Sequence, residues 1–253
     1  MAADTSGTVL VSVVSHRHGD AVLQLLRDLA RHARGSVWRV VLTLNVPEPA
    51  VEALAAQACA GLELRIRRNA RPRGFGENHN AALTANPGSA YFAVLNPDLR
   101  LHDDPLPRLI EALRGAERAA CAYPRQTDAQ GRPCNPPRAV PTPGALCARY
   151  LGRRPPPPAD DWVNAAFLLF DARVYGELGG FDERYWLYCE DVDICLRLQL
   201  AGYGLVAGDA SVQHLGRRAS HVQLQHLYWH LLSLLRLWRS PVPQAYRRLR
   251  AAR

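Results

Sequence analysis

TVLVSVV, residues 8–14, is a nearly continuous run of β-branched residues close to the start of the chain. A run without polar alternation predicts a strand that is buried on both faces of a sheet. Downstream, apolar residues recur at helical spacing from Val22 to Ala33, and Gly35 is a stop signal for that helix. Residues 8–35 therefore predict a buried strand followed by a helix that packs on the sheet.

The same alternation continues along the chain. Residues 38–44 and 62–66 have strand character, and the Ala-rich residues 49–60 between them have helical character. Strand, helix, strand, helix and strand at this spacing predict right-handed βαβ units on a parallel sheet. In such sheets ligands bind beyond the carboxyl ends of the strands. This rule selects three polar residues as candidate binding residues: Ser15, His16 and Asn45.

Composition and charge narrow the class of protein. The chain has 253 residues, 48% of them hydrophobic and 21% charged, which suffices for one large α/β domain or two small ones. The formal net charge of +8 favours an anionic partner: a phosphorylated small molecule, an anionic membrane surface or a nucleic acid. All 31 basic residues are Arg, which suits phosphate recognition but is also expected from coding bias. No helix-turn-helix, zinc-finger or stacked-aromatic signature is present, so we expect no nucleic-acid partner.

The six cysteines and the apolar runs indicate the cellular setting. No two cysteines have C-x-x-C spacing and no secretory leader is evident, so neither a zinc site nor a disulfide framework is predicted. No apolar run reaches the ~20 residues that span a bilayer. We therefore expect a cytoplasmic protein.

Residues 67–80, RRNARPRGFGENHN, follow the third expected strand and lead into a helix. Their arginines, and a Gly-x-Gly before a helix N-terminus, form a candidate cradle for a diphosphate. The pattern is neither a dinucleotide fingerprint nor a P-loop, so alone it is weak.

A fourth strand is expected at 91–95, and the turn Asn96-Pro97-Asp98 follows it. A carboxylate just past a core strand is suited to holding a divalent cation against a diphosphate. The alternative is an Asn-Pro turn in which Asp98 caps a neighbouring segment.

The middle of the chain changes character. A helix and then a short strand are expected between residues 104 and 123. Residues 124–160 are rich in proline and have no periodicity, so we interpret them as a long connecting loop, either a lid on the acceptor side or a passive connector. A buried strand at 161–170 follows, and Asp171 is expected to cap a short helix that ends at Gly179-Gly180.

FDERYWLYCEDVD, residues 181–193, holds five acidic and four aromatic residues at the start of a helical segment. Aromatic bulk beside Glu190 and Asp191 would partly shield these carboxylates from water and raise their affinity for protons, as a general base requires. The alternative is a helix N-terminus enriched in acids because they suit the helix dipole. Taken alone, the stretch leaves both interpretations open.

The C-terminal part combines a histidine at a strand end with a long apolar helix. Short strands are expected at 204–207 and 210–213, and the second delivers His214. Residues 221–238 predict a helix that is apolar nearly all round, and arginines crowd the residues after it. This helix suits an interfacial contact with an anionic membrane; the alternative is a core helix with a solvated tail.

In this order, these pieces resemble glycosyltransferase family 2, the inverting nucleotide-sugar transferases of the GT-A fold, and especially its rhamnosyltransferase-like bacterial members that build cell-surface polysaccharide. The resemblance extends to about Ser220. It rests on the 9–14 strand, Asn69 with Gly74-Phe75-Gly76-x-Asn78-x-Asn80, Leu95-Asn96-Pro97-Asp98, Trp162-Val163-Asn164-Ala165-Ala166, Gly179-Gly180-Phe181-Asp182-Glu183, Glu190-Asp191-Val192-Asp193 with Arg197, Gly202-Tyr203 and His214. Each motif is weak alone, but the ordered set is specific.

The resemblance implies an α/β, GT-A Rossmann-like fold with a mostly parallel central sheet flanked by helices and a C-terminal amphipathic helical extension. Residues 1–220 would form the transferase domain: 1–123 the nucleotide-sugar half, 124–160 the Pro-rich connecting loop, and 161–220 the acceptor and catalytic half. Residues 221–253 would form the C-terminal helix and basic tail.

The resemblance also implies roles for individual residues. Asp191 would be the base that deprotonates the acceptor hydroxyl, with Glu190 in reserve, while Asp182, Glu183 and Asp193 would serve the loop and helix structure. Asp98 would hold Mg or Mn on the donor diphosphate, and His214 would complete the metal site. The nucleotide-sugar-binding residues would be Ser15, His16, Asn45, Arg73, Gly74, Phe75, Asn78, Asn96 and Asp98. The acceptor residues would be Asn164, Ala165, Tyr185, Trp186 and Tyr188.

Four positions depart from the family's pattern. Ser15-His16 stands where the family often has Tyr-Asn, and Leu44-Asn45 where it often has Asp-Asn, so Asn45 would read the nucleotide without the usual charged partner. Asn96-Pro97-Asp98 has one carboxylate instead of two, and Asn164-Ala165-Ala166 replaces a Ser-Gly-Ala type of sequence, which would crowd the acceptor.

The expected function is an inverting transfer of a sugar, with rhamnose as the candidate, from a nucleotide-diphospho-sugar to a glycan or lipid-linked acceptor in bacterial cell-surface polysaccharide synthesis. Peripheral contact with the inner face of the cell membrane is expected with it. The alternative is a catalytically weak or inactive nucleotide-sugar-binding module, motivated by the missing acids near Asn45 and at Asn96.

Overall fold

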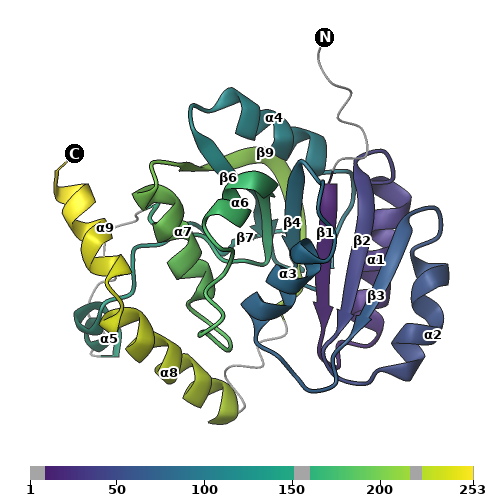
Figure 1. The fold of residues 1–253 in the computed structure, drawn as a ribbon, viewed down its shortest axis with the longest axis horizontal. Coiled ribbons are helices and arrows are strands. Elements are labelled where there is room, and N and C mark those ends of the chain that lie inside the picture. Colours follow the sequence, from purple (N-terminus) through teal and green to yellow (C-terminus); the bar gives the residue numbers. More distant parts are fainter. Residues whose placement is uncertain (1–8, 151–159, 217–223, 253) are drawn as a thin grey trace.

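The computed structural model describes residues 9–150, 160–216 and 224–252 (Figure 1). The centre of this part is a nine-stranded sheet with the strand order β3-β2-β1-β4-β8-β6-β9-β5, and β7 pairs with β6. The strands are β1 (Val9–Ser15), β2 (Val37–Leu44), β3 (Glu63–Arg68), β4 (Tyr91–Leu95), β5 (Leu99–Arg100), β6 (Ala119–Thr127), β7 (Pro133–Cys134), β8 (Phe167–Asp171) and β9 (Gly204–His214).

The first four strands form the predicted βαβ arrangement. β1 pairs in parallel with β2 and β4, and β2 pairs in parallel with β3. Helices α1 (Asp20–His32), α2 (Pro49–Ala58) and α3 (Phe75–Thr84) connect them. Parallel pairing brings the carboxyl ends of β1–β3 to one edge of the sheet, the lower edge in Figure 1.

The second half makes the sheet mixed. β8 is antiparallel to both β4 and β6, whereas β9 is parallel to β6 and antiparallel to β5. Helices α4 (Leu106–Gly115), α5 (Pro143–Tyr150), α6 (Ala172–Glu177) and α7 (Glu190–Leu200) belong to this half. The predicted α/β fold, a central sheet flanked by helices, is thus confirmed, and the parallel pairing is concentrated in the N-terminal half.

Apolar side chains fill both faces of the sheet. On one face, Val9, Val11 and Val13 pack with residues of α1, α2 and α4. On the other face, Leu10 and Phe92 belong to a cluster with residues of α3, α6 and α7. Alternate residues of β1 therefore enter two different cores, which explains why this strand is apolar at nearly every position.

Several expected boundaries were wrong. The 124–160 segment is not a loop throughout, because β6 continues to Thr127 and both β7 and α5 lie within it. The strand expected at 161–170 begins only at Phe167. The two short strands expected at 204–213 are one strand, β9, which Gly208 does not interrupt. This glycine lets α4 approach the sheet, since a Cβ there would lie 2.6 Å from Cδ2 of Leu109.

The C-terminal residues form two helices, α8 (Leu224–Arg239) and α9 (Val242–Ala251), where one helix followed by a basic tail was expected. Leu234, Leu237 and Tyr246 pack in one cluster with Tyr185 and Leu196, so both helices extend the core. The expected helix start at 221–223 lies outside the described residues. Within the described ranges, every helix is too short or too polar to cross a bilayer.

Candidate active site

The carboxylates of Glu190 and Asp191 stand in the first turn of α7, which follows a sharp bend. Tyr188 and Cys189 both have positive φ, 72° and 64°, a conformation that costs about 1–3 kcal/mol per non-glycine residue. The expected helix start at Glu190 is confirmed. Backbone strain at this point, directly before the two acids, is typical of a functional site.

Asp191 has the environment of a general base. Its Oδ1 accepts a hydrogen bond from the Val192 amide at 2.8 Å, and the Ala165 amide and the Arg138 charge also favour its ionised form. Burial outweighs these contacts and raises the pKa of Asp191 to about 6. A carboxylate that gains and loses its proton near neutral pH is suited to taking a proton from a hydroxyl group.

Glu190 is more enclosed than Asp191. It is 5% exposed, and its Oε2 has no hydrogen-bond partner within the described ranges. Burial first, and the adjacent charge of Asp191 second, raise the pKa of Glu190 well above its usual range. A carboxyl group in this environment keeps its proton, so Asp191 is the better base and Glu190 stays the reserve candidate.

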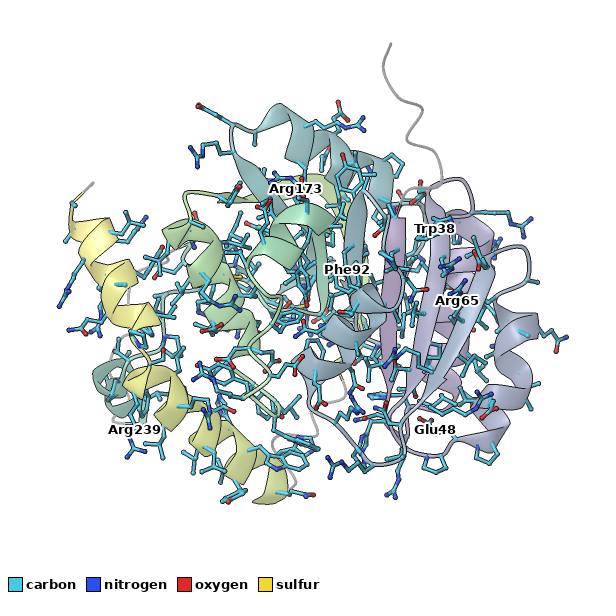
Figure 2. All side chains as sticks on the ribbon, viewed as in Figure 1. Trp38, Glu48, Arg65, Phe92, Arg173 and Arg239 are labelled. Carbon is cyan, nitrogen blue, oxygen red and sulfur yellow. The ribbon has the colours of Figure 1, made fainter. Side chains whose placement is uncertain are left out.

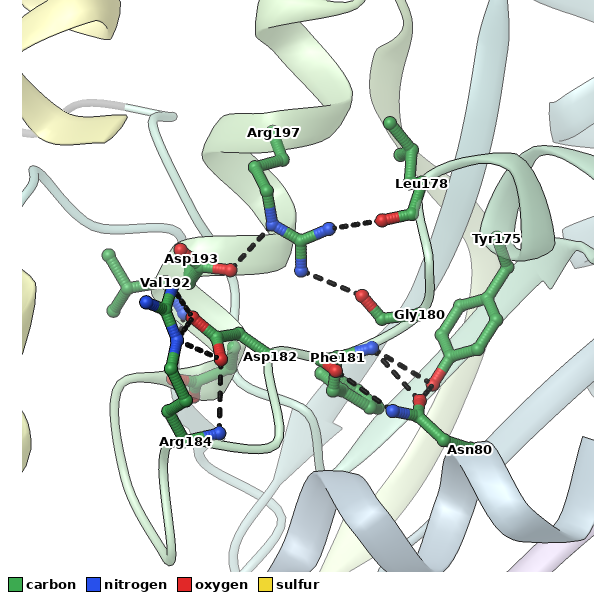
Figure 3. Close-up of polar contacts among 11 residues, drawn as sticks. Asn80, Tyr175, Leu178, Gly180, Phe181, Asp182, Arg184, Val192, Asp193 and Arg197 are labelled. Carbon is green, nitrogen blue, oxygen red and sulfur yellow. Dashed lines mark hydrogen bonds and ion pairs between the residues drawn. The ribbon is translucent and has the colours of Figure 1, made fainter. Parts of the chain in front are cut away.

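Other acids of the stretch hold the loop in place (Figure 3). Arg197 donates to Asp193 Oδ2 at 2.6 Å and to two backbone carbonyls of the preceding turn at 2.8 and 2.7 Å. Asp182 accepts from the Arg184 amide at 3.0 Å and pairs with its guanidinium. The predicted structural roles of Asp182 and Asp193 are confirmed.

Asp98, directly before β5, lies beside His214 at the end of β9. Antiparallel pairing of β5 with β9 puts Leu99 opposite His214, and His214 Nε2 lies 3.3 Å from Asp98 Oδ1. A carboxylate oxygen and an imidazole nitrogen are both donors for Mn²⁺. Two converging protein donors fit a divalent cation that takes its other ligands from a diphosphate and water. In the part of the chain that the structure describes, no group of three or more His, Cys, Asp and Glu side chains is arranged for a metal.

A network of amide side chains orients His214, and no sequence motif indicated this network. His214 Nδ1 lies 3.2 Å from Gln126 Oε1 and 3.1 Å from Asn135 Nδ2. Gln126 donates to Asn164 Oδ1 at 2.7 Å, and Asn135 accepts from Arg138 at 2.9 Å. Contacts to Nδ1 leave Nε2 facing Asp98. The network also joins the Asp98–His214 pair to Arg138, whose charge acts on Asp191.

At the carboxyl ends of β1 and β2, polar side chains shape the backbone. Ser15 Oγ donates to Glu48 Oε1 at 2.7 Å, and Glu48, labelled in Figure 2, also accepts from two backbone amides of the loop after β1. Asn45 pairs with the backbone of Arg73 through both its amide oxygen and its amide nitrogen, at 2.8 and 3.0 Å. The same nitrogen lies 3.1 Å from His16 Nδ1. The predicted donor-side residues thus gather at one edge, together with the unpredicted Glu48.

The Gly-x-Gly at the start of α3 is closely packed against the acidic loop. The Phe75 amide donates to Trp186 O at 2.9 Å, and a Cβ at Gly74 would lie 3.1 Å from the same oxygen. A Cβ at Gly76 would lie 2.5 Å from Cβ of Phe181. The glycines allow α3 to pack closely against the acidic loop, and the diphosphate cradle stays a prediction.

Asn78 also has a structural role. It is 1% exposed, donates to the carbonyls of Arg73 and Gly74, and accepts from Asn69 at 2.6 Å. Its polar atoms are occupied inside the protein, so its placement does not support nucleotide binding. The side chain of Arg73 is exposed and pairs with Glu77 at 3.1 Å, and its role at the donor stays a prediction.

Asn96 contacts the segment that carries two further predicted residues, Asn164 and Ala165. The Asn96 amide donates to Ala166 O at 2.8 Å, which joins the end of β4 to the segment before β8. Asn164 and Ala165 belong to that segment, and the Ala165 amide reaches the Asp191 carboxylate. One segment thus contacts both the turn after β4, through Ala166, and the Asp191 carboxylate, through Ala165.

The three aromatic residues of the acidic loop differ in placement. Tyr185 is 1% exposed inside the cluster that includes residues of α8 and α9, so it has no surface with which to line an acceptor pocket. Trp186 is exposed, and its ring centroid lies 6.1 Å from that of Trp229 on α8. Tyr188 Oη lies 2.9 Å from Nδ1 of His226, also on α8. Acceptor roles for Trp186 and Tyr188 stay predictions.

Known sequences similar to this chain transfer sugars. The family described as glycosyl transferase family 2 matches residues 10–169. Rhamnosyltransferase WbbL of Escherichia coli (strain K12) is 27% identical over 216 residues, which cover 78% of this chain and 79% of the relative. N-acetylglucosaminyl-diphospho-decaprenol L-rhamnosyltransferase of Mycobacterium tuberculosis (strain ATCC 25618 / H37Rv) is 36% identical over 91 residues, which cover 32% of this chain and 30% of the relative.

Solved structures share the fold at low sequence identity. Mannosyltransferase PcManGT from Pyrobaculum calidifontis, in complex with GDP-Man and Mn²⁺, superposes with a TM-score of 0.64 at 15% identity, covering 96% of this chain and 68% of that chain. GalNAc-T7 with UDP, GalNAc and Mn²⁺ also gives a TM-score of 0.64 at 15% identity, covering 83% of this chain and 43% of that chain. At these identities the similarity concerns the fold alone.

Proposed function

Since the chain belongs to glycosyltransferase family 2 and is a glycosyltransferase, we propose that it moves a sugar from a nucleotide-diphospho-sugar to a hydroxyl group of a lipid-linked glycan, with Asp191 as the base. The observation that carries this proposal is the half-buried Asp191 carboxylate with its raised pKa, connected through Arg138 and Asn135 to the Asp98–His214 pair.

The proposed reaction is a single displacement that inverts the anomeric carbon. The acceptor oxygen attacks that carbon while Asp191 takes the hydroxyl proton, and the nucleoside diphosphate leaves from the opposite face. The raised pKa of Asp191 makes its carboxylate a stronger base than an exposed aspartate. Glu190 would contribute an uncharged neighbour that leaves Asp191 free to ionise.

Asp98 and His214 are the residues that would hold a divalent cation. When bound, Mg²⁺ or Mn²⁺ would neutralise charge on the departing diphosphate. Gln126 and Asn135 would keep the His214 ring in the orientation that the ligand needs. Only one carboxylate is available at the 96–98 turn, so we expect the cation to bind weakly until a donor supplies phosphate oxygens.

The names of the relatives support a choice of sugar and acceptor. Two relatives are named rhamnosyltransferases, which supports rhamnose as the transferred sugar. The relative from M. tuberculosis is named for an N-acetylglucosaminyl-diphospho-decaprenol substrate, which supports an acceptor linked to a lipid through a diphosphate. Cell-surface polysaccharide synthesis at the inner face of the membrane would bring such an acceptor to the protein.

The exposed side of α8 supports a peripheral contact with an anionic membrane. Leu227, Tyr228 and Leu231, the outer stripe of the helix, are 46%, 59% and 52% exposed. Large apolar side chains at this spacing on one helix face are typical of interfacial helices. The net charge of +8 would add attraction to anionic lipids.

Asp191→Asn tests the base, with Asp98→Asn as a matched variant at the other end of the site. Asp191→Asn should lower the transfer rate by roughly 10²- to 10⁴-fold. Its thermal shift with nucleotide sugar and Mn²⁺ should stay unchanged, because the donor contacts are intact. Asp98→Asn should lose the part of the thermal shift that depends on Mn²⁺.

Full activity of Asp191→Asn would remove the base assignment. A native chain whose melting temperature rises with nucleotide sugars, but which neither transfers nor hydrolyses them with Mg²⁺ or Mn²⁺, would instead be the inactive binding module.

A further inference from the structure

A hollow lies between α8 and the loop that precedes the catalytic helix. Its volume is about 480 Å³, within the range of small-ligand sites. Trp186 from the loop and Trp229 from α8 form one wall, with ring planes inclined at 45°. Leu232 and Leu235, both exposed, add further apolar surface. The hollow therefore offers an apolar chain a place to lie out of water.

Three arginines line the same hollow: Arg184, Arg236 and Arg239. Arg184 is neutralised by Asp182 at 2.6 Å. Neither Arg236 nor Arg239 forms a salt bridge with another of the residues that the structure describes. Their spacing of three places both side chains on one face of α8, and Figure 2 shows Arg239 at the end of this helix. An apolar wall thus ends in two positive charges that no acidic side chain of the described residues pairs with.

We propose that this hollow binds the isoprenoid diphosphate part of the lipid-linked acceptor. The isoprenoid chain lies against Trp186 and Trp229, and the diphosphate contacts Arg236 and Arg239. Two phosphates in sequence match two guanidinium groups one helical turn apart, because each guanidinium donates two parallel hydrogen bonds to phosphate oxygens. The inference rests on the proposed function and assigns a site to its acceptor.

The loop that lines the hollow also leads into the helix that carries the base, Asp191. Ser233 on α8 donates to Leu187 O at 2.8 Å, and Tyr188 Oη contacts His226 of the same helix. Leu187 and Tyr188 lie just before Cys189, the N-cap of α7, and the first turn of α7 carries Asp191. A lipid diphosphate held against α8 therefore keeps the attached acceptor sugar beside the loop that presents the catalytic carboxylate.

The outer stripe and the hollow have different occupants. Leu227, Tyr228 and Leu231 form an open helix surface that suits a flat bilayer. The hollow adds a second wall, from Trp186, and an arginine pair at one end, which suits a single chain with a compact anionic head. A bilayer surface alone would require neither of these features.

Binding of farnesyl diphosphate to the full-length protein, followed by tryptophan fluorescence without any sugar donor, tests the site directly. We expect saturable quenching that Trp229→Phe largely removes. Farnesol has only the isoprenoid chain and inorganic diphosphate only the anionic group, so each should bind more weakly than farnesyl diphosphate. Arg236→Gln with Arg239→Gln should weaken binding by at least about tenfold, since two charge-assisted contacts are lost.

Arg247→Gln with Arg248→Gln on α9 is the matched control, because it removes the same charge from exposed arginines outside the hollow. It should leave farnesyl diphosphate binding unchanged. An equal loss in both double variants would show a response to net charge alone and overturn the proposal, as would unchanged binding in the Arg236 and Arg239 double variant.

Kinetics in detergent micelles separates this inference from the proposed function. The Arg236 and Arg239 double variant should raise KM at least about tenfold for a sugar acceptor on an isoprenoid diphosphate, with kcat unchanged. KM for the same acceptor sugar without lipid should not change, and a parallel rise would contradict a lipid site. Farnesyl diphosphate binding without any sugar transfer would instead refute the proposed function and leave the site standing.

Discussion

Burial of Asp191 serves the proposed chemistry and opposes folding. It raises the pKa of this residue from the ordinary 3.8 to about 6, so the folded state holds the proton more tightly than the unfolded state. The contribution of Asp191 to stability is therefore most favourable below its unfolded pKa and is lost as the pH rises through the folded pKa. Asp191→Asn cannot ionise, so we expect it to melt at a higher temperature than the native chain at about pH 7.5 but not at about pH 3.5. Thermal denaturation, followed by circular dichroism, measures the melting temperatures of the variant and the native chain at both pH values.

Asp182→Asn is a control of opposite sign. Burial alone would raise the pKa of Asp182, but the hydrogen bonds and charge of Arg184 outweigh it and lower the pKa. The ionised Asp182 therefore stabilises the fold above its unfolded pKa, and this variant should melt below the native chain at about pH 7.5. A lower melting temperature for Asp191→Asn under the same condition would contradict the desolvation argument.

Sequence reasoning found the acids of the site but not the amides that hold it together. Asp191 and the Asp98–His214 pair were selected by motif order, and the structure puts Asp98 beside His214. The roles of Gln126 and Asn135 could not be predicted, because an amide side chain in a segment without periodicity is equally typical of a solvent-exposed loop. Their partners come from β9, some 80–90 residues away, and only the pairing of β6 with β9 brings them together.

At the scale of elements, Arg197 ties α7 to the turn after α6: it pairs with the buried Asp193 of its own helix and donates to the carbonyls of Leu178 and Gly180. Arg197–Asp193 and Arg173–Glu177 have the same i,i+4 spacing, but the side chains of the first pair are 20% and 2% exposed and those of the second are 65% and 52% exposed. Arg197→Met would leave a buried carboxylate and two carbonyls without their donor, so we expect a loss of about 3–5 kcal/mol in the free energy of unfolding. Arg173→Met should cost less than about 1 kcal/mol. Urea denaturation compares them, and similar losses would argue against a specific role for Arg197.

Elements with a strong period were predictable, and glycines were the main source of error. The buried run of β1 and the helical spacing of α1 give these two elements close to their observed bounds. Gly208 and the Gly-x-Gly at 74–76 look like turn and phosphate-loop signals, yet in the structure they allow close packing against Leu109 and Phe181. A glycine that is needed for space and one that is needed for a turn are identical in sequence, so only tertiary contacts separate them.

At the scale of the whole molecule, the C-terminal helices are part of the core and not a removable tail. Tyr185, Val192 and Leu196 of the catalytic half are buried in one cluster with Leu237 of α8 and Tyr246 of α9. Deleting the chain after Ser220 would expose this cluster next to Asp191. Such a deletion would disturb the active site together with any membrane contact, so point substitutions on the outer stripe are the better test.

We expect the outer stripe of α8 to be the part of the protein that binds a membrane. Leu227→Ser with Leu231→Ser should weaken binding to phosphatidylglycerol-containing vesicles by at least about tenfold, because two exposed leucines lose their apolar burial in the interface. Leu54→Ser, which changes a leucine of similar exposure (43%) on α2, should bind like the native chain. Binding should also fall with added salt and be weak on neutral phosphatidylcholine vesicles, since the net charge of +8 contributes part of the attraction. Flotation assays measure the effects of the substitutions, of salt and of lipid charge on vesicle binding. Equal binding of the double variant and the Leu54 variant would show that α8 does not make the membrane contact.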